Sequence, residues 1–193
     1  MDAVMNTGYV YAAIAVIIGA ALLIKLIRRK MRTRRREANP RKITMRDIDR
    51  MTDGSEFEQY LFRLVHELGY PEVYKTTGSR DFGADLVFTD SMGRRVVVQA
   101  KRYGANHPVG LSAVQEVYTS MRYYEAERSL VLTSGRYTEA CRILAGVNGV
   151  LLLDRDDLSD LMDCFKAKRW DEACAILEQE PEHRTANWSA KRR

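Results

Sequence analysis

The sequence predicts an α/β fold in which helices flank a mixed central β-sheet, with one transmembrane helix before it near the N-terminus. Three observations predict this. Continuous apolar runs at residues 130–132 and 150–153 are typical of strands buried on both faces. Segments with apolar residues at helical spacing alternate with these runs. Residues 8–27 are apolar apart from Lys25, and about 20 helical residues span a hydrocarbon core of about 30 Å.

The expected elements follow one another in the order α-β-β-β-α-β, which gives a mixed sheet flanked by helices. We expect helices at 54–68, 110–125, 137–146 and from 157 onward, and strands at 72–77, 84–89, 94–101, 128–133 and 149–153. The first helix carries an apolar stripe at Phe57, Leu61, Leu64, Val65 and Leu68. Gly69 and Pro71 end it, because these residues stop helices. An amphipathic helix around Trp170 closes the chain.

The N-terminal apolar segment has all its neighbouring basic charge on one side. Before it stands a single charged residue, Asp2, and after it come Arg28, Arg29, Lys30, Arg32, Arg34, Arg35 and Arg36. The positive-inside rule then places the N-terminus outside the cell membrane and the rest of the chain in the cytoplasm. A cleaved signal peptide needs its basic residues before the apolar segment, so we expect the span to be retained. A buried core helix is the alternative interpretation.

Charge divides the chain into unequal parts. The 193 residues carry a formal net charge of +5, yet 10 of the 31 Lys and Arg residues lie between residues 25 and 42. The remaining 21 basic residues face 24 acidic ones, so the part after residue 42 has a net charge of about −3. The basic run therefore indicates binding to anionic lipid rather than to nucleic acid. Any nucleic-acid surface on the rest of the chain must be a local patch.

Five segments follow from these patterns. They are a short extracytoplasmic N-terminus at 1–7, a transmembrane helix at 8–27, a basic juxtamembrane linker at 28–45, a globular domain at 46–165, and a C-terminal helix with a basic tail at 166–193. Cys141, Cys164 and Cys174 form no CxxC pair, which fits reduced thiols rather than a zinc site.

The strands at 84–89 and 94–101 form a hairpin around a turn at residues 90–93. Asp85 then lies roughly opposite Gln99, because the two residues are at similar distances from the turn centre. Successive side chains alternate faces, so Gln99 and Lys101 point the same way. A carboxylate, an amide oxygen and an ammonium group meet at one end of the hairpin. The alternative is a partly exposed hairpin with polar residues on its solvent face.

These three residue types suit cleavage of a phosphodiester with the help of a metal ion. Mg²⁺ prefers oxygen ligands and takes one or two carboxylates together with water and phosphate. Asp85 supplies a carboxylate and Gln99 an amide oxygen. Such an ion polarises phosphate and generates hydroxide. Lys101 then orients the water or stabilises the charge that develops on phosphorus.

The pattern Asp85…Gln99-Ala100-Lys101 resembles the PD-(D/E)xK nuclease superfamily, in the Gln-x-Lys form of the Mrr-like (type IV restriction endonuclease) domain. The resemblance covers about residues 50–165 and includes Phe57-Glu58, Leu68-Gly69-Tyr70, Asp81-Phe82-Gly83-Ala84-Asp85-Leu86-Val87, Gln99-Ala100-Lys101-Arg102-Tyr103, Val109-Gly110, Val114-Gln115-Glu116, Leu130-Val131-Leu132-Thr133-Ser134 and Tyr137-Thr138-Glu139-Ala140. Two positions depart from the superfamily pattern. Gln99 replaces an acidic residue, and Ala84 stands where a Pro is frequent. The first departure removes a negative charge from the expected metal site.

The resemblance implies a restriction-endonuclease-like fold and an endonuclease that hydrolyses DNA with Mg²⁺ or Mn²⁺, and the N-terminal apolar segment is expected to anchor it to the membrane. Asp85 and Gln99 are the expected metal ligands, Lys101 the catalytic cation, and Glu58 a further acid that compensates for the lost charge. The expected DNA contacts are Lys75, Arg80, Arg94, Arg95, Arg102 and Gln115. Restriction of foreign or modified DNA and a homodimer are the expected role and assembly. The alternatives are an inactive DNA-binding or scaffold module with this fold, and a repair or junction-resolving nuclease.

Overall fold

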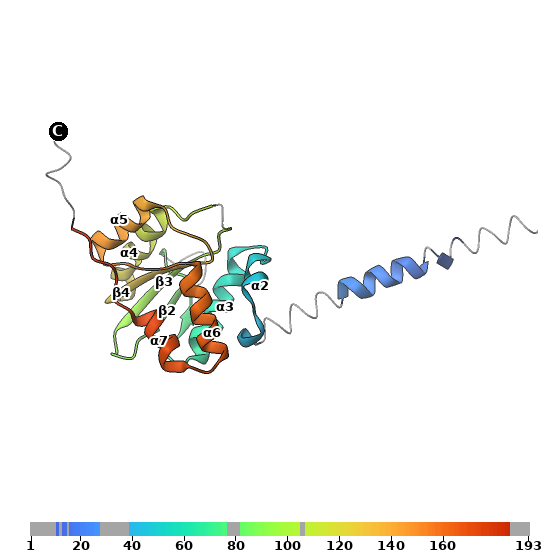
Figure 1. Ribbon diagram of the computed structural model, residues 1–193, viewed down its shortest axis with the longest axis horizontal. Coiled ribbons are helices and arrows are strands. Elements are labelled where there is room, and N and C mark those ends of the chain that lie inside the picture. The colour runs from blue at the N-terminus through green and yellow to red at the C-terminus, as the bar shows by residue number, and fades with distance from the viewer. Residues whose placement is uncertain are drawn as a thin grey trace, which may run out of the picture. The chain divides into compact units, whose positions relative to one another are not determined.

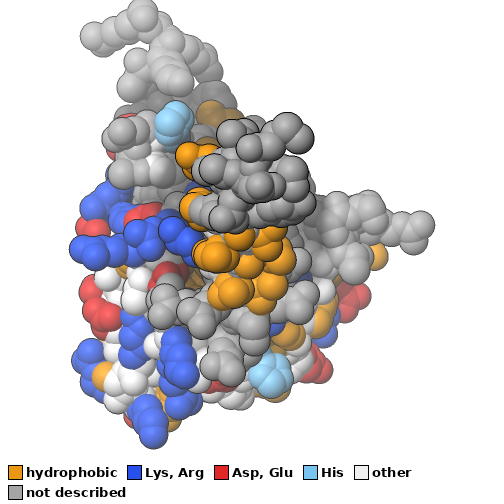
Figure 2. All heavy atoms as spheres, turned by 90° about the vertical axis from the view of Figure 1, so that its right-hand side faces the viewer, with side chains coloured by type: hydrophobic (Ala, Val, Ile, Leu, Met, Phe, Trp, Pro, Cys, Tyr) orange, Lys and Arg blue, Asp and Glu red, His pale blue; other side chains and the backbone are white. Residues whose placement is uncertain are grey.

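The computed structural model describes residues 11, 13–14, 16–27, 39–76, 82–104 and 107–185, and it divides into two compact units, Met1–Lys42 and Ile43–Arg193. In the first unit the described residues up to 27 are helical and exposed. Figure 2 shows a group of hydrophobic side chains at the surface near the middle of that view. Among the residues that were described, no helix has the length and apolar character needed to cross a membrane. The expected span at 8–27 includes residues 8–10, 12 and 15, and the expected linker includes 28–38; these lie outside the described residues.

The second unit is built on a five-stranded sheet in the order β1-β2-β3-β4-β5. The strands are β1 Tyr74–Lys75, β2 Leu86–Thr89, β3 Arg95–Lys101, β4 Arg128–Thr133 and β5 Leu151–Leu153. Strands β1, β2 and β3 pair antiparallel, whereas β3, β4 and β5 pair parallel. Parallel neighbours need a crossover, which α4 and α5 supply. The predicted mixed sheet is therefore confirmed.

Helices cover both faces of the sheet (Figure 1). They are α2 Met45–Asp49, α3 Gly54–Glu67, α4 Ser112–Tyr124, α5 Glu139–Asn148, α6 Arg155–Lys166 and α7 Trp170–Glu178, after a 3₁₀ turn at Pro40–Lys42. One core contains the buried faces of α3, α6 and α7, and the other contains those of α4 and α5. The helix predicted at the C-terminus packs into the first core through Ala173 and Leu177.

The strand β3 shows how the two cores share the sheet. Val96, Val98 and Ala100 contribute to the core of α3, α6 and α7, whereas Val97 contributes to the core of α4 and α5. Because side chains alternate, Gln99 and Lys101 continue the face of Val97 towards α4. The prediction that these two side chains share a face is confirmed.

Local chemistry explains where the elements differ from the expected ranges. Glu72 has a left-handed backbone with a φ of 55°, so the strand expected at 72–77 begins later, as β1 at Tyr74, and residue 77 lies outside the described residues. The short helix α2 was not predicted; Thr44 caps it in a capping box with Asp47. Helix α6 begins earlier than expected because the Asp154 side chain accepts from the backbone N–H of Asp156 at 2.9 Å.

Asp90 holds the turn between β2 and β3. Its side chain is buried, with the residue 2% exposed, and Oδ1 accepts from the backbone N–H groups of Met92 at 3.0 Å and Arg94 at 2.9 Å. Its Oδ2 accepts from Nε of Arg94 at 2.9 Å, and Arg128 lies 3.5 Å away. Gly93, at a φ of 78°, completes the turn.

All three cysteines are free thiols. Cys141 and Cys164 are buried, and burial raises the pKa of the Cys141 thiol to about 11. They act as small apolar side chains in the packing.

Candidate active site

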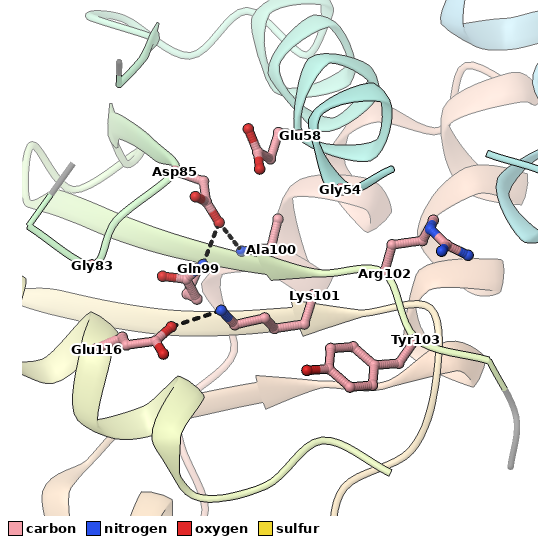
Figure 3. A pocket seen from close by; sticks show the side chains of 10 residues that line it. All are labelled: Gly54, Glu58, Gly83, Asp85, Gln99, Ala100, Lys101, Arg102, Tyr103 and Glu116. Atoms are coloured by element: carbon pink, nitrogen blue, oxygen red, sulfur yellow. Dashed lines mark hydrogen bonds and ion pairs between the residues drawn. The ribbon is translucent and has the colours of Figure 1, made fainter. Parts of the chain in front are cut away.

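The antiparallel pairing of β2 with β3 places Asp85 beside Gln99. Leu86 pairs with Val98, so the preceding residue Asp85 lies opposite Gln99, as predicted, and its N–H donates to the Val98 carbonyl at 2.8 Å. The Asp85 carboxylate is buried, 8% exposed, and Oδ2 accepts from Nε2 of Gln99 at 2.5 Å and from the Ala100 N–H at 2.7 Å (Figure 3). These donors replace water around the carboxylate and fix its orientation.

Lys101 ends β3 and reaches across to α4. Its Nζ lies 2.7 Å from Oε2 of Glu116, and the two side chains are 23% and 41% exposed. Figure 3 shows the Lys101 ammonium between the strand end and α4, on the same side of the sheet as Gln99. The ion pair holds the Lys101 ammonium at the edge of the site that Asp85 also lines.

Glu58 enters from the opposite side, on helix α3. Its side chain points towards Asp85 in Figure 3, and Oε2 lies 3.0 Å from Nζ of Lys75. Lys75 also donates to the Ser55 hydroxyl at 3.3 Å. Helix α3 thus brings Glu58 to the edge of the sheet, as predicted, and Glu58 forms an ion pair there with Lys75.

These side chains line a pocket of about 480 Å³ at the ends of β2 and β3. The lining residues are Gly54, Glu58, Gly83, Asp85, Gln99, Ala100, Lys101, Arg102, Tyr103 and Glu116. Gly83 closes one wall, with a φ of 93° and a backbone so close to α4 that a Cβ would lie 2.4 Å from the Glu116 carbonyl oxygen. Only glycine fits this contact, so the segment before Asp85 is locked against the helix that carries Glu116.

The oxygen donors in the pocket suit a hard divalent cation. Asp85 and Glu58 offer carboxylates and Gln99 an amide oxygen, and Mg²⁺ prefers such ligands together with water. The Gln99 amide turns its nitrogen to Asp85, and a half-turn of the amide exchanges nitrogen for oxygen. Within the described ranges, no cluster of three or more His, Cys, Asp or Glu side chains is placed to hold a metal ion. The pocket therefore offers few negative charges to a metal ion, but its oxygen donors are of the type that Mg²⁺ prefers.

The predicted DNA contacts fall into three groups. Lys75 and Arg102 lie at the pocket, Arg102 as a lining residue and Lys75 as the partner of Glu58. Arg94 and Arg95 lie at the turn end of the hairpin, away from the pocket, where Arg94 pairs with Asp90. Gln115 is exposed on α4 and does not line the pocket, and Arg80 lies outside the described residues.

A carboxylate–guanidinium pair lies near the pocket at Arg102. Nη1 and Nη2 of Arg155 donate to the two carboxylate oxygens of Asp49 at 2.7 and 2.8 Å. This hydrogen bonding, with a smaller contribution from the charge of Arg102, lowers the pKa of Asp49 against the opposing effect of burial. Arg155 also donates to the Ser134 carbonyl at 2.8 Å, and the Ser134 hydroxyl accepts from the Tyr103 N–H at 3.1 Å.

Glu116 is the charged pocket residue that is absent from the predicted site residues. It lies three residues after Ala113 and four before Ser120, both buried in α4. Helical spacing therefore puts it on the face turned to the sheet. Gln115, the residue of α4 that is expected to contact DNA, faces solvent. The spacing of the apolar residues along the helix is the sequence feature that distinguishes Glu116 from Gln115.

Comparison with known proteins gives one family match. The family model Mrr_cat, described as restriction endonuclease, matches residues 48–162. A search of curated proteins found no match. Among solved structures, the chain is similar to the MspJI restriction endonuclease in complex with a 27-mer oligonucleotide, with 19% identity, a TM-score of 0.49, and 75% of this chain and 38% of that chain covered.

Two further solved structures show similarity to the chain. They are the DNA modification-dependent restriction endonuclease AspBHI, with 21% identity, a TM-score of 0.41, and 63% and 34% of the two chains covered, and the protein of unknown function AF1548, with 18% identity, a TM-score of 0.43, and 51% and 56% covered. The chain thus spans between about a third and somewhat over half of the length of the solved chains that it matches.

Proposed function

The chain belongs to the Mrr_cat family of restriction endonucleases, and from that membership we propose that it is a divalent-metal-dependent DNA endonuclease that hydrolyses phosphodiester bonds. The observation that carries the proposal is the meeting of Asp85, Gln99 and Lys101 in one pocket at the ends of β2 and β3. We propose restriction of foreign or modified DNA as its role.

The proposed mechanism assigns each pocket residue a task. Asp85, Gln99 and Glu58 would hold Mg²⁺ or Mn²⁺, which supplies polarisation of the phosphate and a water of lowered pKa. The Ala100 N–H fixes the Asp85 carboxylate in place. Lys101 places its ammonium beside the phosphoryl oxygens, where negative charge grows as water adds to phosphorus. The attacking water gives up a proton to solvent, the P–O bond to the leaving oxygen breaks, and that oxygen takes up a proton from solvent, which leaves a phosphomonoester and a hydroxyl group.

The test is cleavage of supercoiled plasmid by the purified full chain in detergent micelles. Plasmid with and without base modification is incubated with Mg²⁺, Mn²⁺ or EDTA. We expect nicking or linearisation that EDTA abolishes, and a loss of about 10²-fold or more for Lys101→Ala. Lys166→Ala, which removes a cation from α6, is the matched control and keeps full activity. Equal cleavage by Lys101→Ala, with contaminating nuclease excluded, contradicts the assignment.

A membrane anchor is a further part of the proposal. The apolar residues 8–27 and the basic run from Arg28 to Arg36 support a single span with the N-terminus outside, the nuclease unit in the cytoplasm, and contact of the basic run with anionic lipid. We expect the full chain to stay with membranes after carbonate extraction and a chain without residues 1–27 to be released. That deletion should reduce protection against incoming DNA in cells while leaving cleavage in vitro unchanged. Carbonate release of the full chain contradicts the anchor.

The pocket also gives a reason to keep an inactive DNA-binding module as a second candidate. Gln99 supplies no charge, and Glu116 neutralises the Lys101 ammonium at 2.7 Å. This candidate predicts plasmid binding without turnover at every concentration of divalent ion.

A homodimer is part of the main proposal, because cutting both strands takes two sites. Sedimentation of the purified chain measures its oligomeric state.

A further inference from the structure

A cluster of four aromatic side chains, here the aromatic platform, lies beside the pocket. It comprises Tyr74 of β1, Phe82 before β2, and Tyr123 and Tyr124 of α4. The rings of Phe82 and Tyr123 stack with centroids 3.9 Å apart and planes at 28°. Tyr124 meets Tyr123 edge-on at 4.9 Å, and Tyr74 lies 6.4 Å from Tyr124. Three segments distant in sequence thus build one continuous aromatic surface.

Much of this surface faces solvent. Phe82 is 50% exposed, Tyr123 61% and Tyr74 42%. Phe82 also has a left-handed backbone with a φ of 48°, a conformation that is unfavourable for a bulky residue. An aromatic side chain that is half exposed, on a residue with a strained backbone, contributes little to the hydrophobic core. Such outliers concentrate at sites that bind ligands.

The platform is rigidly joined to the pocket. Phe82 directly precedes Gly83, which is wedged against the Glu116 backbone and lines the pocket. Phe82 is three residues from Asp85, so their Cα atoms are at most about 11 Å apart. One DNA strand rises about 3.4 Å per nucleotide. A Cα separation of this size corresponds to about three nucleotide steps of a duplex strand, so the platform and the pocket are close enough to contact one DNA strand.

Basic side chains flank the platform. Nη1 of Arg95 donates to the Tyr124 carbonyl at 2.9 Å, and its Nη2 is 3.9 Å from Glu72. Arg122, the residue before Tyr123 in α4, is also exposed. Aromatic faces bordered by cations are the combination with which proteins bind single-stranded nucleic acid, because every base has a flat face and every phosphate a charge.

We propose that the aromatic platform binds an unpaired nucleobase of the strand to be cut, so that the preferred substrate is DNA with a locally unpaired stretch next to the scissile phosphate. This inference rests on the proposed function, since the phosphate is the one held at Asp85. It also gives Arg95 a role, as a phosphate contact of the same strand at the far side of the platform.

The test compares single-stranded with duplex DNA, using the full chain in detergent micelles with EDTA to prevent cleavage. The probe is a fluorescein-labelled oligonucleotide of mixed sequence, alone and annealed to its complement, read by fluorescence anisotropy. We expect Phe82→Gly to weaken binding of the single strand roughly tenfold, as loss of one stacked base does, and to change duplex binding less than twofold. Tyr123→Ala weakens single-strand binding likewise, and Phe82→Trp retains it.

Two features of the design exclude trivial explanations. Glycine tolerates the left-handed backbone at position 82, so Phe82→Gly keeps the thermal midpoint of the wild-type chain. Ile143→Ala, on α5, removes a similarly exposed apolar side chain outside the platform and serves as the matched control. Plasmid cleavage by the same preparations with Mg²⁺ is measured in parallel.

The outcomes separate the platform from the proposed function. Cleavage by wild type together with unchanged single-strand binding by Phe82→Gly overturns the platform and leaves the nuclease assignment standing. Wild-type protein that neither cleaves nor binds DNA overturns both. A change in self-association of Phe82→Gly without a change in DNA binding overturns the platform in favour of a protein interface.

Discussion

The ion pair between Lys101 and Glu116 sets the charge of the site at the level of single residues. Lys101 is the cation expected to act on the phosphate, yet its Nζ is held by Oε2 of Glu116 at 2.7 Å. A partly exposed pair of this kind contributes little to stability, because water screens it. Its effect is positional: Glu116 limits the directions in which the ammonium points.

Glu116→Gln tests that positioning. The amide keeps a hydrogen-bonding oxygen but loses the charge, so Lys101 is held less firmly where the phosphate binds. We expect kcat for plasmid nicking to fall about tenfold with KM and thermal midpoint unchanged, a smaller loss than for Lys101→Ala. The same change in an exposed ion pair away from the pocket, Glu172→Gln in the Arg169–Glu172 pair, is the control and leaves kcat as it is. An unaltered kcat in Glu116→Gln shows that Glu116 does not position Lys101.

The contact between the β2 approach and α4 is the decisive junction at the level of elements. Gly83 puts backbone against backbone there, with a Cβ position 2.4 Å from the Glu116 carbonyl oxygen. The contact fixes Asp85 relative to Lys101 and Glu116 without a side chain between them. Both the pocket and the aromatic platform depend on it, since Phe82 and Asp85 lie on either side of Gly83 in sequence.

Gly83→Ala should be more destabilising than a glycine substitution elsewhere. Gly69 also has a positive φ, of 88°, but nothing lies within 4 Å of its Cβ position. Gly69→Ala therefore measures the conformational cost alone, about 1–2 kcal/mol. Gly83→Ala adds a steric cost of about 1–3 kcal/mol in the free energy of unfolding, and cleavage is lost. Chemical denaturation of the two variants gives the comparison. Equal losses of stability would show that the backbone contact gives way freely.

At the scale of the whole molecule, the C-terminal helix is fastened to the hairpin turn through charges. The Ser91 N–H donates to the Glu178 carboxylate at 3.1 Å, and Arg128 donates to the Glu178 and Gln179 carbonyls at 3.1 and 2.6 Å. Arg128 also lies 3.5 Å from Asp90. One buried carboxylate thus connects the turn, β4 and the end of α7.

The acid stability of the unit should depend on Asp90. Burial alone raises the pKa of Asp90, but hydrogen bonds from Arg94 and Met92 outweigh it and the pKa is lowered. The folded pKa is below the unfolded one, so this stabilisation is present above the unfolded pKa and is lost as pH falls through the folded pKa. Asp90→Asn should cost about 1–3 kcal/mol at pH 7 and flatten the fall in stability below pH 4. Thermal midpoints from pH 7 to pH 2 measure it. Parallel curves for the variant and wild type contradict the assignment.

Much of the fold was predictable because strong periodicity and turn signals coincide. The hairpin, its register and the shared face of Gln99 and Lys101 follow from counting residues about the 90–93 turn, and β4 and β5 from uniformly apolar runs. The five residues of α2 are too few to show a helical period. The aromatic platform was also invisible in sequence, since Tyr74, Phe82 and Tyr123 meet only in three dimensions. The site residues remain predictions in their roles.

The geometry of the site depends on the turn at the opposite end of the hairpin. Asp85 faces Gln99 because the Asp90 turn has a set length, and each residue added to or removed from that turn would slide one strand past the other. A slip of one position would turn Lys101 away from α4 and towards α3. Insertions and deletions in this short loop, at the far end of the hairpin from the pocket, would therefore alter the geometry of the site. A change in the length of this loop can thus inactivate the site, in evolution or by design, without a substitution at any pocket residue.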